Sequence, residues 1–315
     1  MCVMIIVLLA LICCGIQFIE SAAGQNKNEY PAAETSKTIV RNGKEYFPKQ
    51  DITTVMVLGI DKFGAKESSG YYRNEGSADS IMLLIFGEND KKCNLLYLNR
   101  DTMLNMDVLG VKGEFAGTSY GQLALAHTYG DGMEESSQNV KNTLQKFIHG
   151  LKVDYYVSMN MDAIPIVNDA VGGVKVNVKD DFSKVNPTIK MGEITLKSDQ
   201  VLDFVRTRKE VGDQKNTTRM ERQMEYLKGF LSALREKESG GANFALNLYD
   251  SVSPYIVTDV SATNLSSMLS RYKDFTLGEI YTPEGENIII DGYYQFIIDE
   301  EKFDELTVKL FYSEK

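Results

Sequence analysis

Four arginines and one glutamine lie close together in a chain of 315 residues whose formal net charge is -10. These residues are Arg206, Arg208, Arg219, Arg222 and Gln223. A guanidinium group is always charged, and its fork of N–H donors matches the oxygens of a phosphate. Several such groups on one short segment therefore favour a diphosphate as ligand over a single carboxylate. The alternative interpretation of this basic segment is a solvated, charged helix face.

A second charged cluster, Arg100 and Asp101, directly follows the apolar run 94–99. Open α/β sheets bind ligands at the carboxyl ends of their strands, so Arg100 is a further candidate ligand of an anion. A turn in which Arg100 and Asp101 pair only with each other is the alternative.

Two acidic residues, Asp61 and Asp79, lie at the ends of the apolar runs 55–60 and 80–86. Proteins usually hold Mg2+ by one or two carboxylates together with phosphate oxygens of a substrate. We therefore expect these two acids to be candidate magnesium ligands beside a diphosphate. Each acid alone is also typical of a turn or a helix cap.

Alternating strands and helices are predicted to position these side chains, and the 43% hydrophobic content is enough to fill their core. Short runs rich in Val, Ile, Leu and Met predict buried strands at 53–60, 80–86, 94–99, 153–159 and 174–178. Apolar residues at helical spacing predict helices at 134–149, 161–171, 198–205 and after the polar loop 212–218. On the last helix, Arg219 and Gln223 flank the apolar stripe, whereas Arg222 is turned further toward the opposite face.

The first 19 residues carry no charge and would span about 28 Å as a helix. We expect an N-terminal transmembrane anchor at 1–19; a cleaved signal segment ending at Ser21-Ala22-Ala23 is the alternative. Basic residues follow this segment rather than precede it, so charge counting alone would place the body in the cytoplasm. Residues 20–50 are polar without an apolar period and predict a flexible tether, which leaves residues 51–315 as the folded domain.

Several classes of protein are disfavoured by what the chain contains. Cys93 is the one cysteine after the apolar segment, so the domain has no intrachain disulfide. Neither His127 nor His149 lies in a metal-binding or nucleophile-base pattern. The chain has no dinucleotide fingerprint, P-loop or His-Glu-x-x-His run. The acidic balance and the absence of nucleic-acid-binding motifs argue against a nucleic-acid partner.

Taken in order, these motifs resemble those of the LytR-CpsA-Psr (LCP) family. The matching segments are Leu58-Gly59-Ile60-Asp61, Ala78-Asp79-Ser80, Asn99-Arg100-Asp101-Thr102, Val205-Arg206-Thr207-Arg208 and Arg219-Met220-Glu221-Arg222-Gln223. The segments 283–286 and 290–294 also look like the end of the family's domain. No single motif is specific to the family, but five motifs in the same order over nearly the whole domain make a strong resemblance.

The resemblance implies a three-layer α/β/α domain with a central mixed sheet and a hydrophobic tunnel for a lipid chain, preceded by a single membrane helix. It implies a phosphotransferase on the extracellular side of a bacterial cell membrane. Such an enzyme moves a glycopolymer from a polyprenyl-diphosphate carrier to peptidoglycan or a related acceptor. It also implies Mg2+ (or Mn2+) held by two acids. It further implies six diphosphate-binding residues, of which Arg100, Arg206 and Arg208 would be catalytic. The acids would be Asp61 and Asp79, and the diphosphate-binding residues would be Arg100, Arg206, Arg208, Arg219, Gln223 and Arg222.

The chain departs from the family pattern at two positions where a cation is common, Ser77 and Gln122. Arg73 and Lys112 in neighbouring loops are candidates to replace the missing charges. Three other functions stay open: a polyprenyl-diphosphate-binding regulatory protein without transfer activity, a polyprenyl-diphosphate hydrolase, and an anchored adhesin. The sequence identifies neither the polymer nor the acceptor hydroxyl.

Overall fold

The computed structural model describes residues 38–41, 43–69, 74, 76–237, 241–272 and 274–314. The predicted membrane segment 1–19, most of the predicted tether and Arg73 lie outside these residues. Among the residues that are described, no helix is both long and apolar enough to cross a bilayer.

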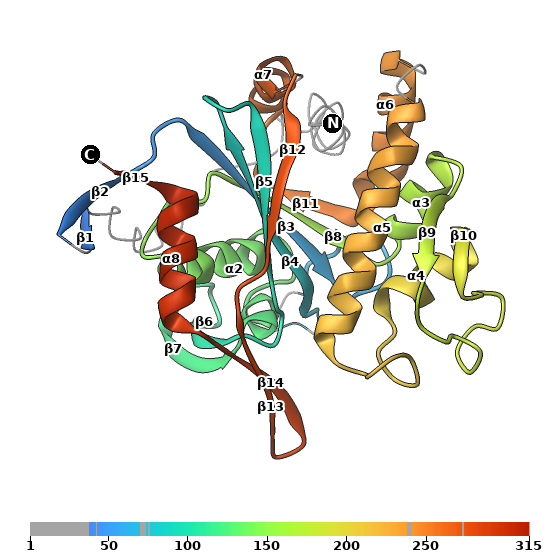
Figure 1. Cartoon of the computed structure of the whole chain (residues 1–315), viewed down its shortest axis with the longest axis horizontal. Helices are drawn as coiled ribbons and strands as arrows, with labels where there is room; N and C mark the ends of the chain where they lie inside the picture. Colours follow the sequence, from blue (N-terminus) through green and yellow to red (C-terminus); the bar gives the residue numbers. More distant parts are fainter. Residues whose placement is uncertain are drawn as a thin grey trace.

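A six-stranded mixed sheet lies at the centre of the molecule (Figure 1). Its order is β11-β8-β3-β4-β5-β12; β8 is parallel to β3 and β12 is parallel to β5, whereas the other neighbours are antiparallel. The strands are β3 (Ile52–Ile60), β4 (Ala78–Gly87), β5 (Lys92–Leu98), β8 (Tyr155–Asn160), β11 (Ile256–Thr258) and β12 (Thr276–Tyr281). The expected central mixed sheet is therefore confirmed.

Helices cover both faces of this sheet, which gives three layers (Figure 1). One face carries α3 (Ala163–Ala170), α4 (Ser198–Arg206), α5 (Asn216–Lys237), α6 (Gly241–Val252) and α7 (Ala262–Tyr272), with the short η4 (Ser253–Tyr255) before β11. The other face carries η2 (Leu123–Thr128), α2 (Glu134–Phe147) and α8 (Glu300–Phe311). Successive strand residues point to opposite faces, so Val55 enters one core and Met56 the other. This is why the central strands are apolar throughout.

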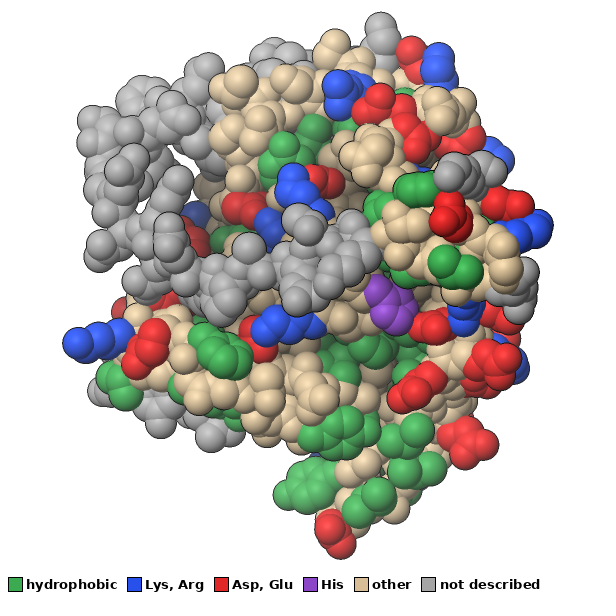
Figure 2. All heavy atoms as spheres, turned by 90° about the vertical axis from the view of Figure 1, so that its left-hand side faces the viewer, with side chains coloured by type: hydrophobic (Ala, Val, Ile, Leu, Met, Phe, Trp, Pro, Cys, Tyr) green, Lys and Arg blue, Asp and Glu red, His purple; other side chains and the backbone are tan. Residues whose placement is uncertain are grey.

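Within the described residues, four smaller sheets lie around the central one. They are formed by β1 (Ile39–Arg41), β2 (Lys44–Pro48) and β15 (Tyr312–Glu314); by β6 (Met103–Leu109) and β7 (Phe115–Gln122); by β9 (Val174–Val178) and β10 (Gly192–Leu196); and by β13 (Gly285–Ile290) and β14 (Tyr293–Ile298). The β13–β14 hairpin projects from the body, and hydrophobic side chains gather on it (Figures 1 and 2).

The predicted tether is wrong over residues 39–41 and 44–48, which form β1 and β2. β2 pairs with β15 at the other end of the chain, from Pro48 opposite Tyr312 to Tyr46 opposite Glu314. Such a strand is stabilised by pairing with a segment that is distant in the sequence. Its own residues therefore need not show the apolar alternation from which a strand is predicted. The other strands and helices expected from the sequence are all present, with ends shifted by a few residues.

Candidate active site

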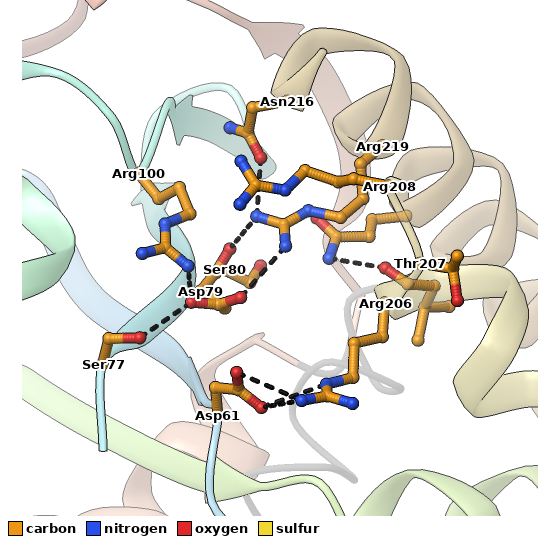
Figure 3. A network of polar contacts seen from close by, with 12 residues as sticks. Asp61, Ser77, Asp79, Ser80, Arg100, Arg206, Thr207, Arg208, Asn216 and Arg219 are labelled. Atoms are coloured by element: carbon orange, nitrogen blue, oxygen red, sulfur yellow. Dashed lines mark hydrogen bonds and ion pairs between the residues drawn. The ribbon is translucent and has the colours of Figure 1, made fainter. Parts of the chain in front are cut away.

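Charged side chains from several segments meet at one edge of the central sheet, where β3 and β5 end and antiparallel β4 begins (Figure 3). Asp61 directly follows β3, Asp79 is the second residue of β4, and Arg100 follows β5 by two residues. Arg206 is the last residue of α4, and Arg219 lies in the first turn of α5. The chain order of the motifs is thus converted by the fold into a single cluster.

Asp79 lies at the centre of the cluster and is only 6% exposed. Its carboxylate accepts hydrogen bonds from Arg219 at 3.0 Å, from Ser77 at 3.0 Å and from Arg100. Arg219 is 2% exposed and also donates to the Asn216 side chain at 2.6 Å. Burial lowers the pKa of the Arg219 guanidinium, and the Asp79 carboxylate opposes this shift. Two buried cations therefore share one carboxylate, which leaves this part of the cluster positive.

A second buried carboxylate, Asp101, orients the arginines from the other side. Its Oδ1 lies 3.4 Å from Arg100 Nε and accepts a hydrogen bond from Gln122 Nε2 at 3.0 Å. Its Oδ2 lies 3.6 Å from Arg208 Nη1 and has no hydrogen-bond partner within the described part of the chain. Burial raises the pKa of Asp101, and the neighbouring guanidinium groups oppose the rise. Asp101 thereby draws Arg100 and Arg208 toward one point.

Two arginines on the exit from α4 form the exposed rim of the cluster. Arg206 pairs with Asp61 at 3.0 Å and lies over the Phe63 ring at 5.5 Å from its centroid. Arg208 lies over the Tyr294 ring at 6.0 Å. The side chain of Arg206 is 46% exposed, so this rim is reachable from solvent while Arg219 is not. Figure 3 shows that Arg206 at the rim and the buried Arg100 and Arg219 extend toward the same region of the site.

Gln223 lies at the junction between the charged cluster and an apolar cavity. Its amide donates to the Val205 carbonyl at 3.0 Å, and its oxygen accepts from the Tyr97 hydroxyl. Burial raises the pKa of Tyr97 to about 12, so this hydroxyl keeps its proton and remains a donor. Tyr97 was not among the sequence candidates, because a tyrosine inside an apolar strand gives no signal beyond ordinary packing.

The apolar cavity has a volume of about 180 Å³ and lies between the sheet and helices α3 and α5. Ser80 and Gln223 are its polar lining residues beside the cluster. The apolar lining residues are Val57, Leu58, Met82, Leu84, Leu95, Met159, Ile164, Val167, Val205, Leu227, Phe230 and Leu277, with the Tyr226 ring beside them. Apolar cavities of about 150 Å³ stay dry and take up a benzene-sized molecule. The cavity is therefore suited to an apolar group whose polar end faces the arginines.

The structure does not bring Arg222 into this cluster. Its guanidinium donates to the Phe204 carbonyl at 3.0 Å, to the Thr207 carbonyl and to Asp180 at 2.8 Å. These bonds satisfy carbonyls at the end of α4, which otherwise have no helical partner. Arg222 thus fixes the direction in which the chain leaves α4, and with it the placement of Arg206.

The two departures from the family pattern both lie in the site. Ser77 donates to Asp79, and Gln122 donates to Asp101 and, at 2.6 Å, to the Tyr294 carbonyl. Lys112 does not replace the charge missing at Gln122. It lies in the turn between β6 and β7, whereas Gln122 pairs with Met103 at the opposite end of this ribbon.

Asp61 and Asp79 are the residues that could hold a divalent cation. They lie on adjoining strands, since the Asp61 amide donates to the Ser77 carbonyl at 2.9 Å. Among the described residues, no group of three or more His, Cys, Asp or Glu side chains could hold a metal. Two carboxylates beside guanidinium groups suit Mg2+ that takes its other ligands from phosphate and water. The donor set therefore fits magnesium held together with a phosphorylated substrate, and does not fit a closed protein cage.

The layers and the cluster define an α/β protein with a cationic site beside an apolar cavity. The model of the LytR_cpsA_psr family matches residues 15–311, so the chain belongs to this family. The chain is 27% identical to the polyisoprenyl-teichoic acid–peptidoglycan teichoic acid transferase TagT of Bacillus subtilis, over 90% of this chain and 84% of that one. It is 26% identical to TagU of Oceanobacillus iheyensis, which carries the same activity in its name, over 84% and 77% of the two chains.

Solved structures of relatives share the fold. Bacillus subtilis TagT superposes with a TM-score of 0.60 at 23% identity, over 89% of this chain and 98% of that one. Bacillus subtilis TagV superposes with a TM-score of 0.61 at 20% identity, over 83% and 96%. The three-layer arrangement around a mixed sheet is thus the fold of this family.

Proposed function

We propose that the protein transfers a glycopolymer from a polyprenyl-diphosphate carrier to peptidoglycan or a related cell-envelope acceptor. The observation that supports this most strongly is the guanidinium cluster at the polar end of an apolar cavity. A polyprenyl diphosphate has the matching two parts, an isoprenoid chain and a charged diphosphate. The names of the curated relatives, which are teichoic acid transferases acting on peptidoglycan, support the same reaction.

In this reaction the acceptor hydroxyl oxygen bonds to the phosphorus that carries the sugar. The bridging P–O bond to the lipid-side phosphate breaks, polyprenyl phosphate leaves, and the hydroxyl proton passes to solvent. Catalysis of this kind consists mainly of positioning and charge neutralisation. Arg100, Arg206 and Arg208 neutralise the reacting phosphate oxygens, and the buried Arg219 adds positive charge behind them. Gln223 lies where the diphosphate is joined to the isoprenoid chain.

Asp61 and Asp79 would hold Mg2+ in this site. A cation held there would supply further positive charge to the diphosphate. Four guanidinium groups already face three carboxylates, Asp61, Asp79 and Asp101, so the cluster is positive before any metal binds. A divalent cation would add two charges to this excess of one positive charge, which is enough to neutralise the two negative charges of a diphosphate diester.

We further propose that residues 1–19 anchor the protein in the cell membrane, with the domain on the extracellular side of a bacterial envelope. The uncharged length of the segment supports the anchor. A lipid-linked substrate supports the same placement, because its isoprenoid chain partitions into the bilayer.

Arg206→Ala tests the proposal, because Arg206 is half-exposed and its loss leaves no buried group unpaired. We expect the variant to fold normally and to lose transfer from a polyprenyl-diphosphate-linked glycan to peptidoglycan. Arg271→Ala is the matched control, since Arg271 is also exposed and paired with an acid, Glu88, but lies away from the cluster. Retained transfer in Arg206→Ala would contradict the proposal. Release of polyprenyl phosphate without an acceptor would indicate a hydrolase, and binding without turnover would indicate a regulatory protein.

A further inference from the structure

A second and larger hollow, of about 730 Å³, lies on the side of the molecule that carries α8 and the β6–β7 ribbon. Figure 2 looks on to this side. We call this hollow the ribbon groove. Its floor is formed by Asn105, Asp107, Thr118 and Tyr120, and its walls include Lys146 from α2 and Glu300 from α8.

The floor of the ribbon groove is continuous with the arginine cluster. In the ribbon, Met103 pairs with Gln122, Asn105 with Tyr120, and Asp107 with Thr118. Alternate residues of a strand share a face, so Gln122 and Tyr120 point to the same side. Gln122 contacts Asp101 in the cluster at 3.0 Å. The floor therefore begins one residue pair from the cluster, about 7 Å away at the usual rise of a strand.

The opposite face of the ribbon is part of the core, because Leu104 and Met106 are buried there. The groove face instead exposes Tyr120, whose side chain is 62% exposed, and the amide of Asn105. An exposed aromatic ring beside an amide offers an apolar surface and hydrogen bonds at the same place. This combination suits a sugar ring, which has apolar C–H faces and a rim of hydroxyl and acetamido groups.

The charges of the groove select against a polyanion. Arg41 and His149 both contact Asp304, at 3.0 Å and 2.8 Å, and Lys146 pairs with Asp107 at 2.6 Å, so the basic side chains of the groove are paired with its own carboxylates. Glu300 and Glu301, at the start of α8, form no ion pair within the described part of the chain and leave an acidic excess in the groove. A phosphate-rich donor polymer is repelled by such a surface, whereas a protonated amine is attracted.

We propose that the ribbon groove binds the acceptor: a strand of amino sugars whose attached peptides carry a free amine. This inference rests on the proposed function, in which such an acceptor must reach the arginine cluster. The strand lies along the ribbon with its sugars on Tyr120 and its amine near the two glutamates of α8. Its reacting hydroxyl lies at the Gln122 end, beside Asp101.

Binding of soluble, uncross-linked peptidoglycan fragments tests the groove directly. We expect Tyr120→Ala to weaken binding at least tenfold, with Tyr293→Ala as the matched control, because Tyr293 is 71% exposed but lies on the β13–β14 hairpin outside the groove. Acetylation of the fragment amines should weaken binding to the wild type. It should have no effect on a variant that carries both Glu300→Gln and Glu301→Gln. Equal affinities of Tyr120→Ala and Tyr293→Ala, or no effect of acetylation on the wild type, would overturn the inference.

Two further readouts separate this inference from the proposed function. Tyr120→Ala should bind geranyl diphosphate as the wild type does, and its transfer should show a raised KM for the acceptor with kcat preserved at saturation. An unchanged acceptor KM would refute the groove and leave the proposed function standing. The opposite outcome is also distinguishable. If the wild type binds the fragments through their amines, Tyr120→Ala loses this binding, and the wild type shows no transfer activity, the groove is supported and the proposed function is refuted.

Discussion

Asp79→Asn is the substitution whose effect follows most directly from the structure. The change keeps the shape of the side chain but removes the charge that buried Arg219 and Arg100 share. Removing one partner of a buried ion pair costs about 3–5 kcal/mol, because the remaining charge is left uncompensated. At about 2–4 °C per kcal/mol for a domain of this size, the melting temperature should fall by about 6–20 °C.

The free energy of unfolding should be measured in urea, without divalent cations, in the presence and absence of inorganic diphosphate. Diphosphate stabilises the folded form by about 2.7 kcal/mol at a hundred times its Kd. In Asp79→Asn the anion no longer competes with a carboxylate for the two guanidinium groups, so its Kd should be lower than for the wild type. Diphosphate should therefore narrow the stability gap between the two proteins.

Asp61→Asn is the control, because its ion pair with Arg206 lies at the exposed rim. Exposed pairs contribute about 0–1 kcal/mol, so this variant should unfold almost as the wild type does. Equal destabilisation by the two substitutions, or a gap that diphosphate leaves unchanged, would refute the reasoning that Asp79 holds two buried cations for an anionic ligand.

Three further substitutions test other parts of the structure. Leu95→Phe should fill part of the apolar cavity and raise the KM for a long polyprenyl substrate at least tenfold more than for a short one, as steady-state kinetics with the two substrates would show. Gly229→Ala should cost about 1–3 kcal/mol in urea unfolding, because its Cβ would clash with the Lys175 carbonyl of β9 and push α5 away. Burial lowers the pKa of His127 to about 4, so the stability it contributes is present above pH 6.5 and is lost as the pH falls to 4. Urea unfolding across this interval should show a decline about 3 kcal/mol smaller in His127→Gln than in the wild type.

The central strands were predictable because their residues are apolar on both faces, as in β3, where neighbouring residues enter separate cores. The β6–β7 ribbon was not predicted, because its second strand, Phe115–Gln122, is rich in Gly, Ser and Thr and has one exposed face. β1 and β2 were missed for a related reason, since their pairing partner lies at the other end of the chain.

The residue types of the site were visible in the sequence, but their burial was not. Asp101 looked like a turn partner of Arg100, yet at 2% exposure it also faces Arg208 from another element. Helical geometry indicated that Arg222 points away from Arg219, and the structure places it on the α4 carbonyls. Asn216 accepts a hydrogen bond from Arg219 and so helps to position it. In the sequence it is only a polar residue at the start of a helix, which does not indicate this role.

Calorimetric binding of farnesyl diphosphate tests most directly whether the arginines and the cavity form one site. Farnesyl diphosphate should bind more tightly than either inorganic diphosphate or farnesol. A variant with Arg206→Ala and Arg208→Ala should lose most of the difference between farnesyl diphosphate and farnesol. An affinity no better than that of inorganic diphosphate, or full affinity in the double variant, would contradict a shared site for a diphosphate and its isoprenoid chain.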